Sequence, residues 1–188
     1  YKDEFFNFLK RHYQYYFGIN LNKDKTKQMI NDKTKGIFIQ CELHHTKYDI
    51  LLKPDLIIHR DIFKEIFTDV DVDDLPEYIV SDILYQTVHF NSDKTDLIND
   101  LNLYYYKCKI LLCNESFNQK VDKGYLFAKE YKFKEKRLRK KECIGTFLCK
   151  DGMTIKIREA LSWIDNLREY YDDWLIYPLP TIKELYPN

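Results

Sequence analysis

Two apolar segments, each interrupted by one aspartate, constrain this 188-residue chain more than any other feature. Asp55 lies within LLKPDLIIH, residues 51–59, and Asp82 lies within EYIVSDIL, residues 77–84. Short runs rich in isoleucine, leucine and valine predict buried strands. A carboxylate inside such a strand costs free energy unless it has a hydrogen-bonding or ionic partner or binds a metal. Both aspartates therefore need an explanation.

Length and composition predict one domain, spanning residues 1–188. Hydrophobic residues make up 45% of the chain, and only 5 glycines and 5 prolines occur, which excludes a disordered or linker-rich chain. No apolar run approaches the ~18 residues that a membrane span needs, and no signal-peptide pattern is present, so we expect no membrane association. Because the chain begins at Tyr1 rather than at methionine, we expect it to be part of a longer protein.

Hydrophobic periodicity predicts helices and strands in a mixed order. The strands are expected over residues 36–43, 48–59, 77–90, 124–133 and 142–148, and the helices over residues 2–17, 24–32, 61–67, 96–117 and 154–171. The first two strands are expected to form a hairpin. This order predicts an α/β (α+β) fold in which helices flank a central mixed sheet.

The charges are balanced overall but unevenly distributed. The chain has 30 basic and 30 acidic residues; residues 61–82 contain eight acids and one base, whereas residues 129–141 contain eight bases and two acids. Each cluster by itself is typical of a solvated surface. Together they also suit a cation site beside a surface that binds phosphate, with Lys136, Arg137, Arg139 and Lys140 as the candidate contacts to a DNA backbone.

Several other kinds of site are excluded by their missing motifs. The five cysteines are odd in number and lack CxxC spacing, which favours free thiols in a reducing, intracellular compartment over disulfides, zinc or iron–sulfur clusters. No HExxH, glycine-rich phosphate loop or GxSxG motif occurs. The acidic run at residues 69–74 begins like a calcium-binding loop, but Asp74 occupies its glycine position and Val80 its closing glutamate position.

The two aspartates support two interpretations. If their strands are neighbours, Asp55 and Asp82 converge and are able to hold Mg²⁺ or Mn²⁺, which would activate water and neutralise charge on a phosphate. Alternatively, each lies near a strand end and pairs with main-chain N–H groups or with an arginine such as Arg60.

The helical segment at residues 104–116, YYYKCKILLCNES, also supports two interpretations. In one, Lys107 and Lys109 contact DNA phosphates and Tyr104–Tyr106 stack on bases. In the other, the apolar and aromatic face of this helix belongs to the core. The sequence alone leaves both open.

An ordered series of blocks resembles the lambda-exonuclease-like (YqaJ-type viral recombinase) branch of the PD-(D/E)XK nucleases, in the version found in large DNA viruses. The resemblance covers most of the chain from about Gly36 onward. The matching blocks are FIQCELHH, KPDLIIHRDIF, YIVSDILYQTVHF, YYYKCKILLCNES, GYLFAKEYKF and the C-terminal WIDNLREYYDDWLIYPLPTIKELYPN.

This resemblance implies a restriction-endonuclease-like sheet and a metal-dependent nuclease that hydrolyses phosphodiester bonds at duplex DNA ends. Asp55 corresponds to the aspartate of the PD motif and Asp82 to the acid of the DxK motif, and both are Mg²⁺ or Mn²⁺ ligands in active members. The implied partners are DNA, further copies of the chain and other viral replication or recombination proteins. The implied location is the host cytoplasm or viral factory.

The chain departs from the family pattern at the catalytic lysine. The family's DIK is DIL here, so Leu84 occupies the lysine position, while Lys109 and Cys113 replace a glutamine and a tyrosine of the next helix. Losing such a group costs on the order of 10²–10⁴ in rate. Two outcomes stay open: either Lys53 or Lys109 replaces the missing lysine, or the chain is a catalytically inactive nuclease-fold module that binds DNA or a protein partner.

Overall fold

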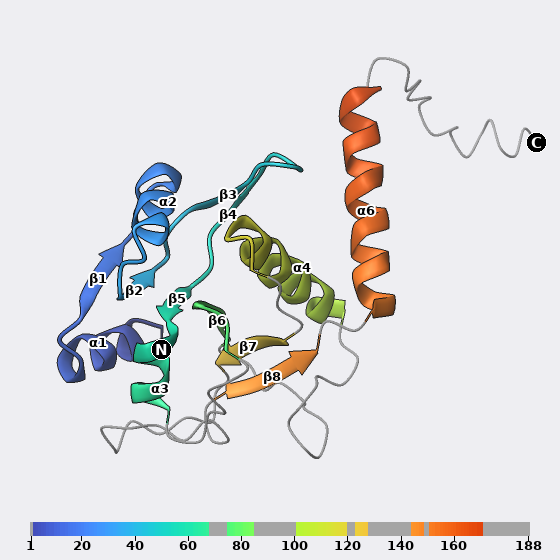
Figure 1. The fold of residues 1–188 in the computed structure, drawn as a ribbon. Helices are drawn as coiled ribbons and strands as arrows, with labels where there is room; N and C mark the ends of the chain where they lie inside the picture. Colours follow the sequence, from blue (N-terminus) through green and yellow to red (C-terminus); the bar gives the residue numbers. More distant parts are fainter. Residues whose placement is uncertain are drawn as a thin grey trace, which may run out of the picture.

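The computed structural model contains a six-stranded mixed sheet at the centre of the fold (Figure 1). The structure describes residues 2–67, 75–84, 101–119, 123–127, 144–148 and 151–170. The strands of the sheet, in spatial order, are β1 (Tyr16–Ile19), β2 (Gly36–Ile39), β5 (Leu56–His59), β6 (Tyr78–Ile83), β7 (Lys123–Phe127) and β8 (Ile144–Leu148).

The sheet contains both parallel and antiparallel neighbours. β1 runs parallel to β2 and β6 runs parallel to β7, whereas the pairs β2–β5, β5–β6 and β7–β8 are antiparallel. A separate two-stranded ribbon is formed by β3 (Leu43–His45) and β4 (Ile50–Leu52). The prediction of a mixed sheet flanked by helices is confirmed at this level.

Helices cover both faces of the sheet, with a hydrophobic core on each side (Figure 1). On one face lie α1 (Lys2–His12) and α3 (Arg60–Ile66); on the other lie α2 (Lys23–Asn31) and α4 (Leu101–Ser116). The alternation of side chains along a strand supplies both cores. In β6, for example, Ile79 and Ile83 pack toward α1 and α3, while Val80 packs toward α4.

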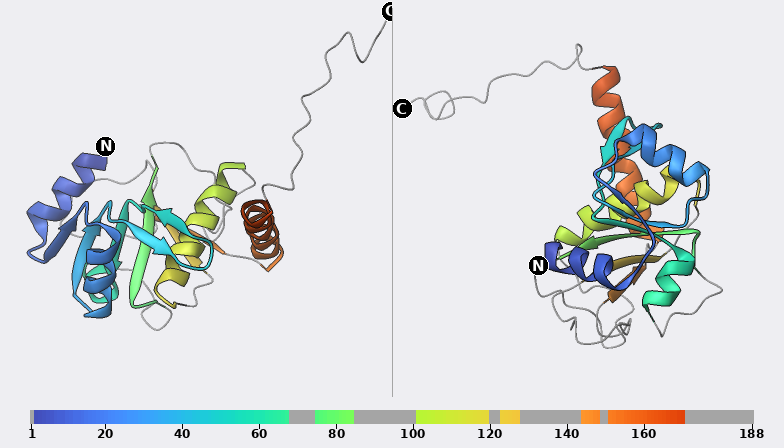
Figure 2. Two further views of the ribbon diagram at one scale, coloured as in Figure 1. Left: turned by 90° about the horizontal axis from the view of Figure 1, so that it is seen from above. Right: turned by 90° about the vertical axis from the view of Figure 1, so that its left-hand side faces the viewer.

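The last described helix, α6 (Asp151–Glu169), lies beside α4 at the end of the molecule away from α1 (Figures 1 and 2). An ion pair joins Arg158 of α6 to Glu115 of α4. The Glu115 carboxylate also lies 3.1 Å from Nε2 of His45 on the β3–β4 ribbon. One acidic side chain thus links three elements that are distant in sequence.

The two strands predicted over residues 36–43 and 48–59 do pair as a hairpin, but each is interrupted. β2 ends at Ile39 because Gln40 adopts a left-handed backbone conformation with φ of 51°. The second strand breaks before Asp55 at Pro54, which has no N–H to donate to a neighbouring strand. The outer halves of the hairpin therefore separate from the main sheet as β3 and β4.

The prediction of one helix over residues 2–17 is wrong at its C-terminal end. α1 ends at His12, and Tyr16 begins strand β1. The spacing of Tyr13 and Tyr16 suits a helix, but aromatic residues also favour strands, and the pairing of β1 with β2 decides the outcome.

Some predictions fall partly or wholly outside the described residues, including the basic segment at residues 129–141 and the end of the strand predicted to reach residue 90. Within the described part of the chain, Cys41, Cys108 and Cys113 are free thiols. No helix in that part is both long and apolar enough to cross a membrane.

Gly36 of β2 lies where the backbone of β1 approaches closely, and a substitution at this position tests that approach. A Cβ at this position would lie 2.9 Å from the main-chain oxygen of Tyr16, which is held by the strand pairing. We expect Gly36→Ala to lower the free energy of unfolding by about 1–3 kcal/mol in urea denaturation. The matched control is Lys35→Ala at the exposed neighbouring position, expected to change it by about 0.5 kcal/mol or less. Equal effects of the two substitutions would contradict the close approach.

Candidate functional site

The register between β5 and β6 brings Asp55 opposite Asp82. Leu56 pairs with Ser81 at the end of this antiparallel ladder; Asp55 directly precedes Leu56, and Asp82 directly follows Ser81. Residues opposite each other on antiparallel strands share one face of the sheet, with Cβ atoms about 5 Å apart. The main-chain N–H of Asp55 donates to Oδ1 of Asp82 at 3.0 Å, and the N–H of Ile83 donates to Oδ2 of Asp55 at 2.9 Å. The structure therefore places the two carboxylates together.

Lys109 of α4 lies directly against Asp82. Its Nζ donates to Oδ1 of Asp82 at 2.8 Å, in an ion pair whose side chains are 14% and 2% exposed. By contrast, Lys53 is exposed, and among the described residues no hydrogen bond or ion pair joins it to either aspartate. Of the two lysines expected to replace the family's lysine, Lys109 is the one that lies at the carboxylates.

Lys2 of α1 is a second amine at the site, and the sequence did not indicate it. Its Nζ donates to both oxygens of Asp55, at 2.8 Å and 2.6 Å. Its side chain is 45% exposed, so this ion pair lies at the rim of the site. The contact joins residues 53 positions apart, and no local pattern around Lys2 distinguishes it from other helix lysines.

Burial and mutual attraction oppose each other in the Asp82–Lys109 pair, and the net effect on the pKa is set by burial for Asp82 and by attraction for Lys109. Burial raises the pKa of the Asp82 carboxyl above its ordinary value, although the Lys109 ammonium and the main-chain donor both oppose this. Burial alone would lower the pKa of Lys109, but attraction to Asp82 and the hydrogen bond between them raise it overall. Each group thus depends on the other to remain charged inside the protein.

Among the described residues, one oxygen of Asp82 has no hydrogen-bond partner. This oxygen, Oδ2, is buried. A buried acceptor of this kind costs free energy unless a water or a cation satisfies it. This oxygen is the feature of the site that most directly suits a bound cation.

The donor set fits magnesium or manganese better than zinc. Within the described residues, no group of three or more His, Cys, Asp or Glu side chains gathers in one place. Structural zinc sites usually need four protein ligands, whereas Mg²⁺ keeps several waters and binds through one or two carboxylates. Asp55 and Asp82 would therefore be enough to hold Mg²⁺ or Mn²⁺.

Leu84 and Tyr106 make the site apolar on the α4 side. The Leu84 side chain is 6% exposed and belongs to the same hydrophobic cluster as several apolar residues of α4. Tyr106 is half-buried, and burial followed by the negative charge of Asp82 raises the pKa of its hydroxyl. Its neighbour Tyr105 is 63% exposed.

The expectation that Lys107 and Lys109 both face phosphate needs a correction. Lys107 is only 2% exposed, so its side chain does not lie on an open surface. Residues two apart on a helix point about 200° apart, and only one of these lysines is able to face the carboxylates. The other proposed DNA contacts, Lys136, Arg137, Arg139 and Lys140, lie outside the described residues.

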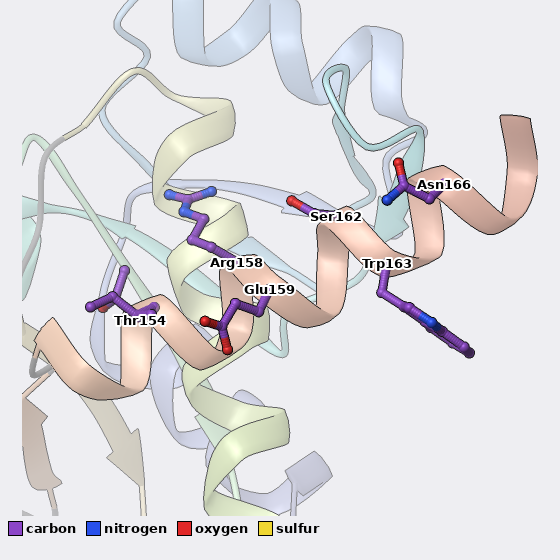
Figure 3. A pocket seen from close by; sticks show the side chains of 7 residues that line it. Thr154, Arg158, Glu159, Ser162, Trp163 and Asn166 are labelled. Atoms are coloured by element: carbon purple, nitrogen blue, oxygen red, sulfur yellow. The ribbon is translucent and has the colours of Figure 1, made fainter.

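A cavity of about 690 Å³ on the surface of α6 is separate from this site and shares no lining residue with it (Figure 3). Arg158, at one side of this cavity, is the partner of Glu115, whereas Trp163 points away from α4 and is 56% exposed. Among the described residues that line this cavity, Glu159 is the one acid, so they do not offer the paired carboxylates of the Asp55–Asp82 site.

Comparisons with known proteins do not identify a family. No family model matches the chain, and no curated protein matches its sequence.

The Asp82–Lys109 pair predicts strongly coupled effects on stability. Lys109→Met leaves a buried carboxylate without its ammonium, so we expect the free energy of unfolding at pH 7 to fall by about 3 kcal/mol. The double variant Lys109→Met/Asp82→Asn has no unpaired charge at this position, so it should recover most of the lost free energy of unfolding. Urea denaturation of the two single variants and the double variant measures the coupling, and strictly additive losses would contradict it.

The Asp82–Lys109 pair also predicts that the stability lost in Lys109→Met depends on pH. Without Lys109, the pKa of Asp82 in the folded protein should rise further above its value in the unfolded chain. The folded state then binds more protons between those two values, so stability is lost as the pH rises through that interval. The deficit of Lys109→Met should therefore be smaller at pH 5 than at pH 7, and an equal deficit at both would contradict the assignment.

Proposed function

We propose that this chain is a metal-dependent DNA nuclease that hydrolyses phosphodiester bonds at duplex ends, with a restriction-endonuclease-like fold. The observation that carries the proposal is the convergence of Asp55, directly before β5, with Asp82 of the neighbouring strand β6, and the Lys109 ammonium 2.8 Å from the Asp82 carboxylate. Two buried carboxylates and one buried amine at the same point suit the cleavage of a phosphodiester.

Each residue of the site has a distinct role in this proposal. Asp55 and Asp82 would hold Mg²⁺ or Mn²⁺, which when bound lowers the pKa of a water and offsets charge on the phosphate. Lys109 keeps Asp82 ionised and supplies the positive charge that Leu84 is unable to supply. The lysine would thus come from the helix above the sheet instead of from the strand.

DNA binding in this proposal depends on the basic segment of the sequence. Residues 129–141 contain eight basic residues, among them Lys136, Arg137, Arg139 and Lys140. Basic side chains hold a DNA backbone by neutralising its phosphates. The implied partners are therefore duplex DNA and, by the family resemblance, further copies of the chain or other viral replication and recombination proteins.

Cleavage of an end-labelled linear duplex in Mg²⁺ or Mn²⁺ tests the enzymatic proposal. Asp82→Asn and Lys109→Met should each lower the cleavage rate by about 10²–10⁴-fold, because one removes a metal ligand and the other the compensating charge. Lys53→Met is the matched control and should cleave at nearly the wild-type rate, since Lys53 is exposed and away from the carboxylates.

A rescue experiment separates loss of chemistry from loss of folding. Leu84 lies on the same strand face as Asp82, so Leu84→Lys in the Lys109→Met background should restore part of the activity. Circular dichroism verifies that each variant is folded. If neither the wild-type chain nor Leu84→Lys yields products with either metal, the enzymatic proposal is wrong.

One observation favours a second function, a catalytically inactive module that binds DNA. Each carboxylate already has a lysine partner, so the charges of these four described side chains balance without a metal. This alternative predicts no cleavage but salt-sensitive binding of duplex DNA, measured by fluorescence anisotropy. Changing Lys136, Arg137, Arg139 and Lys140 together to alanine should weaken the affinity and flatten its dependence on salt. Affinity that responds to neither change would exclude DNA as the ligand.

A further inference from the structure

The two lysines reach the carboxylates from opposite sides of the sheet. Lys109 comes from α4, which covers one face, and Lys2 comes from the first turn of α1, which covers the other. Together with Asp55 and Asp82 they make a group of two positive and two negative charges. A divalent cation added to this balanced group would leave an excess of positive charge in a poorly hydrated place.

The two lysines differ in how readily their ammonium groups can move away from the carboxylates. The Lys109 side chain is 14% exposed and Asp82, its partner, is 2% exposed, so withdrawing this ammonium would strand a buried carboxylate. The Lys2 side chain is 45% exposed and is able to turn toward solvent. Phe5 and Leu9, both fully buried, anchor α1, so the Lys2 side chain can move without displacement of the helix.

The hydrogen bonds of the four carboxylate oxygens show which lysine a bound cation would repel. Oδ2 of Asp82 has no partner among the described residues, so it is available. Both oxygens of Asp55 accept from Lys2, and Oδ2 also accepts from the main chain of Ile83. A cation that uses both aspartates must therefore share the Asp55 carboxylate with the Lys2 ammonium, and like charges on one carboxylate repel each other.

We infer that Lys2 is a further residue of this site: it is the internal counter-ion of Asp55, and a divalent cation binds by displacing it. This inference rests on the proposed function, because it takes Asp55 and Asp82 to be the cation's ligands. Lys2 then makes cation binding weaker than the two carboxylates alone would allow, and Lys109 stays in place as the permanent amine.

Binding of Mn²⁺, followed through the electron paramagnetic resonance signal of the free ion, tests the displacement. The Lys2→Met variant should bind Mn²⁺ roughly fivefold more tightly than wild type, which is the fold-change that corresponds to a half-exposed ion pair. The matched control is Lys10→Met, which removes an exposed lysine from the same helix. It should leave the affinity nearly unchanged.

Chemical labelling gives a second readout that a purely structural role would not change. In the wild-type chain, acetylation of the Lys2 amine by an N-hydroxysuccinimide ester should increase when Mn²⁺ is added, because the amine leaves Asp55. Acetylation of Lys10, followed by mass spectrometry in the same sample, should not change.

The outcomes separate this inference from the proposed function. If Mn²⁺ binds, and binding is lost in Asp82→Asn, but Lys2→Met has wild-type or weaker affinity, the displacement is overturned and the metal site stands. Unchanged labelling of Lys2 on addition of Mn²⁺ overturns it in the same way. If neither the wild-type chain nor Lys2→Met binds Mn²⁺, both the inference and the proposed metal site are wrong.

Discussion

The antiparallel pairing of β5 with β6 fixes the positions of the two buried carboxylates. Its register places Asp55 and Asp82 side by side on one face of a sheet that is otherwise apolar at this point. A slip of one residue would send one carboxylate to the opposite face, into the core beneath α1 and α3. The helices that cover the sheet then supply Lys109 and Lys2, without which two neighbouring negative charges would not be tolerated inside the fold.

For the proposed nuclease, this arrangement gives a physical account of how Leu84 could stand where the resemblance places a lysine. Leu84 follows Asp82 on the same strand face and packs into the core against α4. The amine instead comes from Lys109 of α4, which covers this face of the sheet, and it reaches the Asp82 carboxylate. An ammonium acts on a carboxylate or a phosphate through its position and charge, so the element that carries it is of secondary importance. The proposed nuclease chemistry therefore does not require the DxK spacing to be intact.

Sequence reasoning was most successful where the signal was local. Short runs of mostly consecutive apolar residues indicated β2, β5 and β6, and the order of elements indicated a mixed sheet between helices. It failed where long-range pairing or a single backbone conformation decided the outcome. Gln40 and Pro54 break two strands that composition alone would continue, and pairing with β2 converts Tyr16 from a helix position to a strand position.

In the site, too, local sequence signals were informative and long-range contacts were not. The two aspartates were identifiable because each is a charged residue within an apolar run, and Lys109 because it lies on the next helix. Lys2 was not identifiable, because its contact with Asp55 crosses 53 positions and depends on how α1 packs against the sheet. The burial of Lys107 was missed because lysine is rarely fully buried, and the sequence does not show which other segments cover this helix.

The most direct test of the account is a crystal structure of the chain soaked in Mn²⁺, examined by anomalous diffraction at a wavelength where manganese scatters strongly. The account predicts one anomalous peak within coordination distance of carboxylate oxygens from both Asp55 and Asp82, with Lys109 still bonded to Asp82. A peak elsewhere, or two carboxylates that retain their lysines and bind no ion at saturating Mn²⁺, would contradict it.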